Sequence, residues 1–147
     1  MMMNALQLNI QQLIWLAGVG QVALALGSLA IPTVLNWKVE LAKPQPLIGQ
    51  MFWTYAGYIF VINICFGLLS VFDYRELTNG SRLAMLVTGF IAAYWISRVL
   101  IQFLYFDRTN FPIGKWHKLG EVALVAAFVF FGLVYCGVCY LNYIQLS

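Results

Sequence analysis

Four long runs of apolar residues, separated by short polar segments, make up most of this chain. Each run holds 22 or 23 residues, and a helix of that length rises roughly 33 Å, enough to cross a hydrocarbon layer of about 30 Å. The pattern therefore predicts four membrane-spanning helices. Pro32 lies near the end of the first run and is expected to kink or end that helix. The predicted spans cover residues 13–35, 51–72, 83–105 and 119–141.

The connections between the predicted spans are short, with 15, 10 and 13 residues. Short connections make sequential helices neighbours that run in opposite directions. Three of the spans carry pairs of small residues four positions apart, and such pairs let helices approach closely. We therefore expect an all-α fold, an integral membrane four-helix antiparallel transmembrane bundle that forms a single domain over residues 1–147. The small-residue pairs are Ala23 with Gly27, Gly89 with Ala93, and Ala123 with Ala127.

The composition argues against an ordinary soluble domain. Hydrophobic residues make up 63% of the chain and charged residues only 9%, whereas soluble domains carry about 25% charged residues. The net charge of +3 is spread over the loops, without a run of basic residues. We therefore expect the lipid bilayer to surround these helices, and we expect no nucleic-acid partner.

Basic residues are distributed unevenly between the two sides of the predicted bundle. The first and third loops hold five of them, and the opposite side holds two. The positive-inside rule then places these two loops in the cytoplasm and both termini outside. We expect a multi-pass protein of a bacterial cytoplasmic membrane. The five residues are Lys38, Lys43, Arg108, Lys115 and Lys118, and the two are Arg75 and Arg82.

Arg98 is the most informative polar residue, because it lies roughly 10 Å inside the cytoplasmic end of the third span. An arginine within a bilayer is costly, so it should face the bundle and find a partner. Glu121, near the start of the fourth span on the same side, is the expected partner. Tyr94 and Gln102 lie four residues before and after Arg98, so the three share one helix face. The candidate pocket comprises Tyr55, Tyr58, Tyr94, Arg98, Gln102 and Glu121.

Two interpretations of this pocket compete. In the first, Arg98 and Glu121 form a structural ion pair that joins the third span to the fourth, and Arg98 extends toward lipid phosphate. In the second, the residues bind an anion or a lipid headgroup of the cytoplasmic leaflet. A guanidinium group suits the second role, because it holds a phosphate or carboxylate by two parallel hydrogen bonds.

Gln21 and Asn63 form a second polar pair, on the first and second spans. They lie roughly 12 Å and 14 Å from the outer ends of their spans. Because these depths match, we expect a hydrogen bond between them, worth on the order of 1 kcal/mol in a bilayer. Helix packing is the favoured role of this pair, and a contact with a substrate is the alternative.

The chain has three cysteines, Cys65, Cys136 and Cys139, and the last two form a Cys-x-x-Cys motif near the outer end of the fourth span. Four spans with such a motif resemble membrane thiol oxidoreductases of the vitamin K epoxide reductase kind. That family also needs a second cysteine pair in an external loop, which three cysteines do not provide. The motif lies at a helix C-terminus, where the dipole disfavours a thiolate. We therefore expect buried, inert cysteines, and thiol redox chemistry is the alternative.

Cofactor chemistry finds little support in the sequence. His117 is the single histidine, and a bis-histidine haem needs two. His117 and Glu121 are four residues apart, but two ligands from one helix do not make a metal site. We therefore expect no cofactor and no metal.

These features favour a non-enzymatic membrane protein over an enzyme. We expect an accessory or assembly subunit, or a binder of a lipid or small amphiphile near the cytoplasmic leaflet. Its partners would be the bilayer and an anionic lipid or another membrane protein, and the chain would be able to form homo-oligomers. The first alternative is a small membrane enzyme that performs thiol redox or lipid modification, and the second is a carrier or an oligomeric pore.

Overall fold

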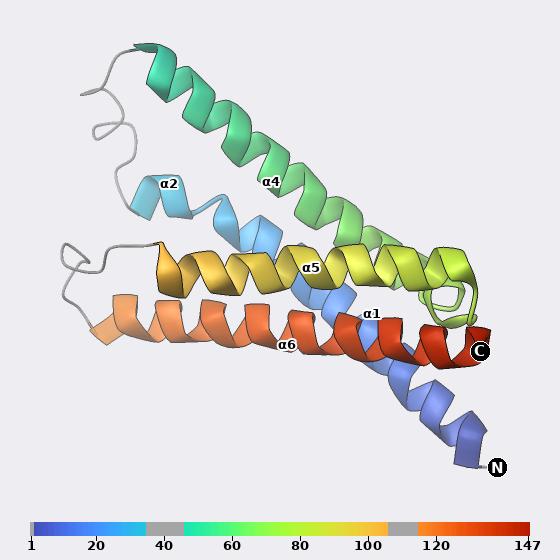
Figure 1. Cartoon of the computed structure of the whole chain (residues 1–147). Helices are drawn as coiled ribbons and strands as arrows, with labels where there is room; N and C mark the ends of the chain where they lie inside the picture. The colour runs from blue at the N-terminus through green and yellow to red at the C-terminus, as the bar shows by residue number, and fades with distance from the viewer. Residues whose placement is uncertain (1, 35–45, 106–114) are drawn as a thin grey trace.

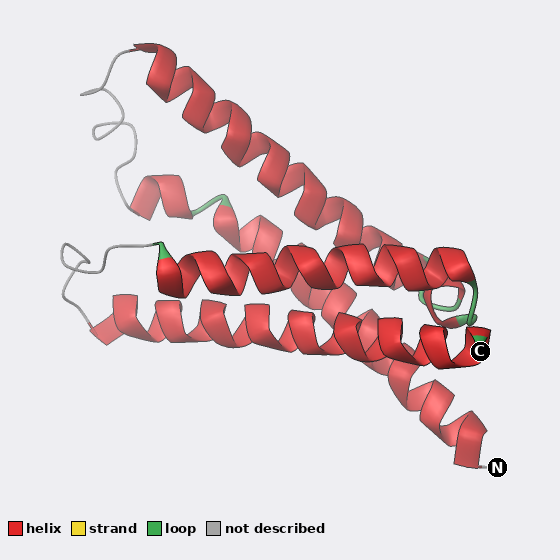
Figure 2. Cartoon of the chain, viewed as in Figure 1, coloured by secondary structure: helices red, strands yellow, loops and turns green. Residues whose placement is uncertain are grey.

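The computed structural model of the protein describes residues 2–34, 46–105 and 115–147. These residues form helices joined by short turns, and four of the helices are long (Figures 1 and 2). The elements are α1 (Met2–Ser28), α2 (Ile31–Val34), α4 (Pro46–Phe72), the 3₁₀ turn η1 (Glu76–Thr78), α5 (Arg82–Leu104) and α6 (Lys115–Leu146).

The four predicted spans are confirmed as helices that are long and apolar enough to cross a membrane. All four begin earlier than predicted, α5 by a single residue. Helix α1 begins at Met2, because the polar residues up to Gln12 include neither glycine nor proline and so do not stop a helix. Helix α4 begins at Pro46, a residue suited to the first position of a helix. Helix α6 covers Lys115–Leu146 and is longer than the predicted span at both ends.

The first helix is interrupted near Pro32, as the sequence predicts. Helix α1 ends at Ser28, which is four residues before Pro32, and the proline ring clashes with a carbonyl at that spacing. Leu29 and Ala30 form a turn in which each N–H bonds to the carbonyl three residues earlier. The predicted span of residues 13–35 is therefore divided between α1 and the short α2.

The turn between α4 and α5 is held by side chains. Ser81 caps α5, because its side-chain oxygen accepts a hydrogen bond of 3.1 Å from the N–H of Ala84. Gly80 has φ of +71°, a left-handed conformation that glycine adopts without steric cost. The buried side chain of Asn142 in α6 accepts from the N–H of Gly80 and donates to the carbonyl of Leu77. The end of α6 thus fixes this turn.

The long helices pack mainly as two pairs. Helices α5 and α6 lie side by side and run in opposite directions, and α1 packs against α4 (Figure 1). Helix α1 crosses behind α5 and α6 in this view and contacts α6. Helix α4 approaches α5 near their connecting turn and leaves it toward Pro46. The arrangement therefore differs from the expected one, in which sequential helices are neighbours throughout.

Two glycines bring α1 and α4 into backbone contact. A Cβ atom on Gly18 would lie 2.8 Å from the Cβ of Ser70 and 2.9 Å from the carbonyl oxygen of Gly67. A Cβ on Gly67 would lie 2.6 Å from a methyl group of Val22. Neither position therefore accepts a larger residue without a shift of the helices.

The small-residue pairs singled out in the sequence do not make this contact. Ala23 and Gly27 are exposed, and a Cβ on Gly27 would meet nothing within 4 Å. Gly89 does face α6, where a Cβ would lie 3.1 Å from the sulfur of Cys139, but its partner Ala93 is exposed. The expectation for Ala23 and Gly27 is wrong, because the contacting face of α1 is the one that carries Gly18.

The core lies between α5 and α6 and consists largely of aromatic rings. The ring of Trp95 is fully buried, with centroids 5.3 Å from the ring of Phe128 and 4.8 Å from that of Phe131. Such aromatic pairs contribute about 0.5–1.5 kcal/mol beyond the burial of their area. Two residues of α5 contact this cluster, since Tyr94 packs against Trp95 and Arg98 lies over Phe128.

Candidate functional site

A hydrogen-bonded network at the centre of the fold joins all four long helices. The amide nitrogen of Gln21 donates to the hydroxyl oxygen of Tyr135 at 2.5 Å, and a second bond of 2.5 Å links the hydroxyls of Tyr135 and Ser70. The indole N–H of Trp95 donates to the amide oxygen of Gln21 at 3.3 Å. All four side chains are fully buried. Each long helix contributes one residue, so the network fixes the helices relative to one another.

The expected hydrogen bond between Gln21 and Asn63 is therefore wrong. Both side chains are buried, as polar groups within the spans should be, but Gln21 bonds to Tyr135 and Trp95. Equal depth in the bilayer does not bring two residues together when they lie on different faces of their helices. Tyr135, Ser70 and Trp95 were not predicted from the sequence as members of this network. Their signal was available, because a polar side-chain group within a span needs a partner.

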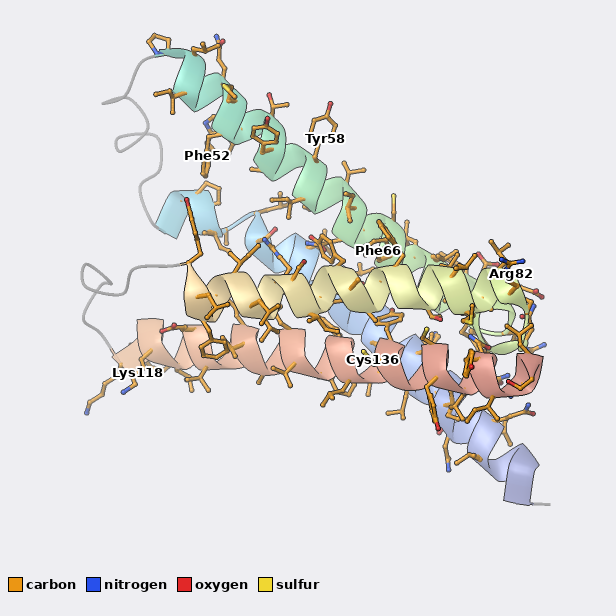
Figure 3. The ribbon with its side chains drawn as sticks, viewed as in Figure 1. Phe52, Tyr58, Phe66, Arg82, Lys118 and Cys136 are labelled. Carbon is orange, nitrogen blue, oxygen red and sulfur yellow. The ribbon has the colours of Figure 1, made fainter. Side chains whose placement is uncertain are left out.

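Asn63 instead lies beside the hydroxyl of Tyr94, on the side where α4 meets α5. Tyr94 also packs its ring edge-to-face against Phe66 of α4, with the ring centroids 5.3 Å apart. Figure 3 shows Phe66 at the part of α4 that approaches α5. These contacts place polar groups of two helices next to one another.

The guanidinium group of Arg98 lies against two aromatic rings. Its central carbon is 5.9 Å from the ring centre of Tyr94 and 5.6 Å from that of Phe128. A cation over an aromatic face is stabilised by about 0.5–1 kcal/mol when exposed and about 2 kcal/mol when desolvated. Arg98 is therefore held facing the helices, as the sequence predicts for a charge in this position.

Three buried side-chain atoms in the described part of the chain make no hydrogen bond of good geometry, and all three belong to this cluster. They are the amide oxygen of Asn63, the hydroxyl of Tyr94 and the Nε of Arg98. Two of them, on Asn63 and Tyr94, lie near enough to interact with each other. Buried polar atoms are nearly always hydrogen-bonded, because an unmade bond costs about 1–3 kcal/mol. Their concentration in one place marks the cluster of Asn63, Tyr94 and Arg98, called here the Arg98 site, as the candidate functional site.

The expected ion pair between Arg98 and Glu121 does not form, although both residues are described. A carboxylate oxygen of Glu121 instead accepts a hydrogen bond of 3.4 Å from Gln102. Arg98 lies opposite Phe128, which follows Glu121 by seven residues, or roughly 10 Å along α6. The register between α5 and α6 thus pairs Gln102 with Glu121 and leaves Arg98 deeper in the molecule.

Tyr55 and Tyr58 do not belong to the site. Their side chains are 59% and 64% exposed, and Tyr58 points away from the other helices in Figure 3. They lie on the half of α4 that separates from α5. They lie toward the same end of the long helices as Gln102, but the sequence does not reveal the divergence of α4.

The three cysteines are free thiols, and two of them are not buried as expected. Cys65 and Cys136 are exposed, whereas Cys139 is half-buried. Figure 3 shows Cys136 on α6. The thiol of Cys139 donates to the carbonyl of Met85 at 3.4 Å. Cys136 and Cys139 are three positions apart on α6, so they are neighbours on the helix surface. Their chemical reactivity stays a prediction.

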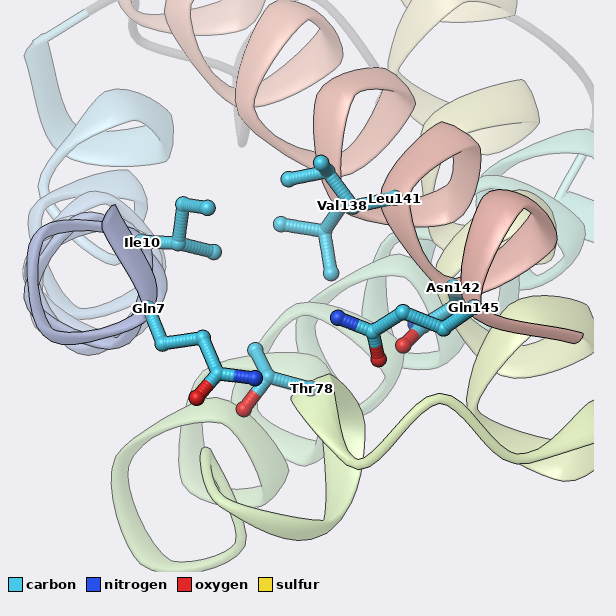
Figure 4. Close-up of a pocket in the computed structure, with 7 residues that line it drawn as sticks. All are labelled: Gln7, Ile10, Thr78, Val138, Leu141, Asn142 and Gln145. Atoms are coloured by element: carbon cyan, nitrogen blue, oxygen red, sulfur yellow. The ribbon is translucent and has the colours of Figure 1, made fainter. Parts of the chain in front are cut away.

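Two pockets lie elsewhere on the molecule. An apolar groove of about 500 Å³ runs between α1 and α6, with Leu24 and Phe130 among its lining residues. A smaller pocket of about 10 Å³ (Figure 4) lies where α1, η1 and α6 meet, and it has room for about one water molecule. The smaller pocket is lined by Gln7, Ile10, Thr78, Val138, Leu141, Asn142 and Gln145.

The described helices define a class of protein, all-helical and with four helices of membrane-spanning length and composition. Within residues 2–34, 46–105 and 115–147, no three histidine, cysteine or acidic side chains are grouped so as to hold a metal ion. Comparison with protein-family models, with curated proteins and with solved structures finds no match. The geometry of the Arg98 site is therefore the basis for assigning a function.

Proposed function

We propose that the chain is a multi-pass integral membrane protein whose four long helices form one antiparallel transmembrane bundle. We further propose that it is a non-enzymatic accessory protein that binds an anionic amphiphile at the Arg98 site. The observation that carries this proposal is that Arg98 forms no ion pair with any described carboxylate, although its Nε is buried.

The energetics of an arginine within a bilayer support a bound anion. Placing arginine at the centre of a membrane helix costs about 2.5–3.5 kcal/mol on insertion scales. The aromatic faces of Tyr94 and Phe128 offset about 2 kcal/mol at most. An anion that accepts two parallel hydrogen bonds from the guanidinium group would offset the remainder.

Extension of Arg98 to the membrane surface is the simplest competing explanation. The residue lies six positions before the end of α5 at Leu104, roughly 9 Å along the helix, which is within reach of an arginine side chain. An extended side chain brings its terminal Nη atoms to the headgroups, whereas the Nε is buried near Tyr94 and Phe128. The inner part of the guanidinium group therefore lies among the helices, and an anion from the bilayer would reach the arginine through the Nη atoms.

The proposed orientation places the Arg98 site near the cytoplasmic leaflet, with both termini outside, in a bacterial cytoplasmic membrane. Lys115 and Lys118 are exposed at the start of α6 on the same side. Juxtamembrane basic residues attract anionic lipids by about 1 kcal/mol each. They would raise the local concentration of an anionic amphiphile at the membrane surface on the side of Arg98.

Native mass spectrometry of the protein released from lipid nanodiscs tests this proposal. The nanodiscs contain phosphatidylcholine mixed with an anionic phospholipid, and Arg98→Gln is compared with Arg82→Gln. Arg82 is the matched control, because it is an exposed arginine at the other end of α5. We expect Arg98→Gln to lose the bound anionic lipid and Arg82→Gln to keep it. Equal retention by the two variants contradicts the proposal.

A further inference from the structure

We infer that the four long helices move as two units, α1 with α4 and α5 with α6, and that this movement opens and closes α4 over Arg98. The movement goes beyond the proposed function, because it is a property of the helices with or without a ligand. The described structure is the open state. Only the consequence for ligand access rests on the proposed function.

Each unit is packed tightly within itself. The contacts between the long helices fall mainly within the two pairs. Gly18 and Gly67 bring α1 and α4 into backbone contact. The buried rings of Trp95, Phe128 and Phe131 fill the space between α5 and α6. Because such close packing resists deformation, each pair behaves as a rigid body.

The two units are joined at one level by the hydrogen-bonded network. Its bonds link α1 to α6, α4 to α6 and α5 to α1, so each bond runs from one unit to the other. At the same level Gly20 lets α1 approach α6, because a Cβ there would lie 3.0 Å from the ring of Phe131. The turn at η1, which Asn142 fixes, closes one end of this arrangement. The network is therefore the pivot, and the opposite end is free to open.

Away from the pivot the two units pack loosely. None of the residues 46–62 of α4 is buried, and this half of the helix leaves α5 (Figure 1). An apolar groove of about 500 Å³ lies beside the pivot, between α1 and α6. Lipid chains cover such apolar surfaces as well as a neighbouring helix does, so no hydrophobic force drives the units together or apart. The open and closed states therefore differ little in free energy.

Closing would place the free half of α4 over Arg98. The helices α4 and α5 run in opposite directions from their connecting turn (Figure 1), and Asn63 of α4 lies beside Tyr94 of α5. Ile59 lies four residues before Asn63 on α4. Arg98 lies four residues after Tyr94 on α5, and residues at this spacing share a helix face. In the closed state Ile59 therefore covers Arg98, and an anion from the bilayer reaches Arg98 only in the open state.

Disulfide cross-linking of α4 to α5 tests the movement. Ala56 lies seven residues before Asn63, and Ile101 lies seven residues after Tyr94. Seven residues make about two helical turns, so Ala56 and Ile101 face one another when α4 closes and are separated in the described structure. With the three native cysteines replaced by serine, the full chain carrying Ala56→Cys and Ile101→Cys is oxidised with copper phenanthroline in phosphatidylcholine nanodiscs.

The matched control pairs Ile101→Cys with Tyr58→Cys. Tyr58 lies two residues from Ala56 on the same helix, but its side chain points away from the other helices (Figure 3). We expect a cross-link within the monomer for Ala56→Cys and none for Tyr58→Cys. Equal yields for the two pairs, including no cross-link in either, or a higher yield for the control, overturn the inference.

An anionic phospholipid in the same nanodiscs tests the consequence for Arg98. A bound anion would hold the helices open, so the lipid at about ten times its half-saturating mole fraction should slow the cross-linking of Ala56→Cys to Ile101→Cys about tenfold. Arg98→Gln should abolish this effect of the lipid. No slowing by a lipid that native mass spectrometry shows to be bound would overturn the covering of Arg98. The proposed function fails separately, if Arg98→Gln retains the anionic lipid.

Discussion

At the scale of single residues, two polar clusters of opposite character lie within the apolar helices. In the network of Gln21, Ser70, Trp95 and Tyr135, the groups satisfy one another. In the Arg98 site, three buried atoms make no hydrogen bond of good geometry. The first cluster therefore suits a structural role, and the second suits a ligand.

The network depends most on the hydroxyl of Tyr135, which joins Gln21 to Ser70. We predict that Tyr135→Phe lowers the free energy of unfolding by about 1–2 kcal/mol, because two buried groups lose a hydrogen bond. Tyr140→Phe is the control, since Tyr140 lies on the same helix and is exposed. Unfolding in mixed micelles with increasing dodecyl sulfate gives the free energy of unfolding of each variant. Equal stability of Tyr135→Phe and Tyr140→Phe would count against a structural network.

The sequence identified the residues of the candidate site better than it identified their partners. Arg98, Tyr94 and Asn63 were all singled out, because polar groups within an apolar run are costly and few. The partners of Arg98 and Gln21 were not predicted, because contacts between helices depend on rotation and register. A shift of two turns along α6 separates the expected partner Glu121 from the observed neighbour Phe128.

At the scale of the helices, glycine rather than side-chain packing determines how α1 meets α4. We predict that Gly18→Ala and Gly67→Ala each destabilise the protein by about 1–3 kcal/mol, because the added methyl group meets backbone or Cβ atoms. Gly57→Ala is the matched control in α4, since a Cβ there meets nothing within 4 Å. The control should be neutral or slightly stabilising, as alanine favours helix.

The same unfolding measurement in mixed micelles compares these three variants. If Gly18→Ala and Gly67→Ala are as stable as Gly57→Ala, the close contact between α1 and α4 does not exist. The contact is also required by the site, because α1 positions the helix that carries Asn63.

The sequence predicted the four long helices and the interruption at Pro32, since length, hydropathy and proline act locally. It did not predict the ends of α1 and α6, because polar residues without glycine or proline allow a helix to continue past the apolar run. It also did not predict that α4 diverges from α5. Short connections limit which helix ends are near one another, but they do not fix the crossing angle.

At the scale of the whole molecule, the account depends on the bilayer as the solvent of the long helices. Large apolar side chains are exposed on every long helix, among them Leu16, Phe72, Phe90 and Leu133. In water a protein with such a surface would aggregate, whereas in a bilayer the apolar side chains contact acyl chains. Arg98, which forms no ion pair with a described carboxylate, points to a bound anion only if the helices lie in lipid, because an arginine at an aqueous surface needs no partner.

The most direct test of this claim is the labelling of the two ends of α6 from one side of the membrane. With Cys65, Cys136 and Cys139 replaced by serine, Lys115→Cys and Ser147→Cys are each exposed to a membrane-impermeant maleimide in intact spheroplasts. We predict that Ser147→Cys is labelled from outside, and that Lys115→Cys is labelled only after permeabilisation. Labelling of both from outside without permeabilisation, or recovery of the protein in the aqueous fraction without detergent, would contradict the account.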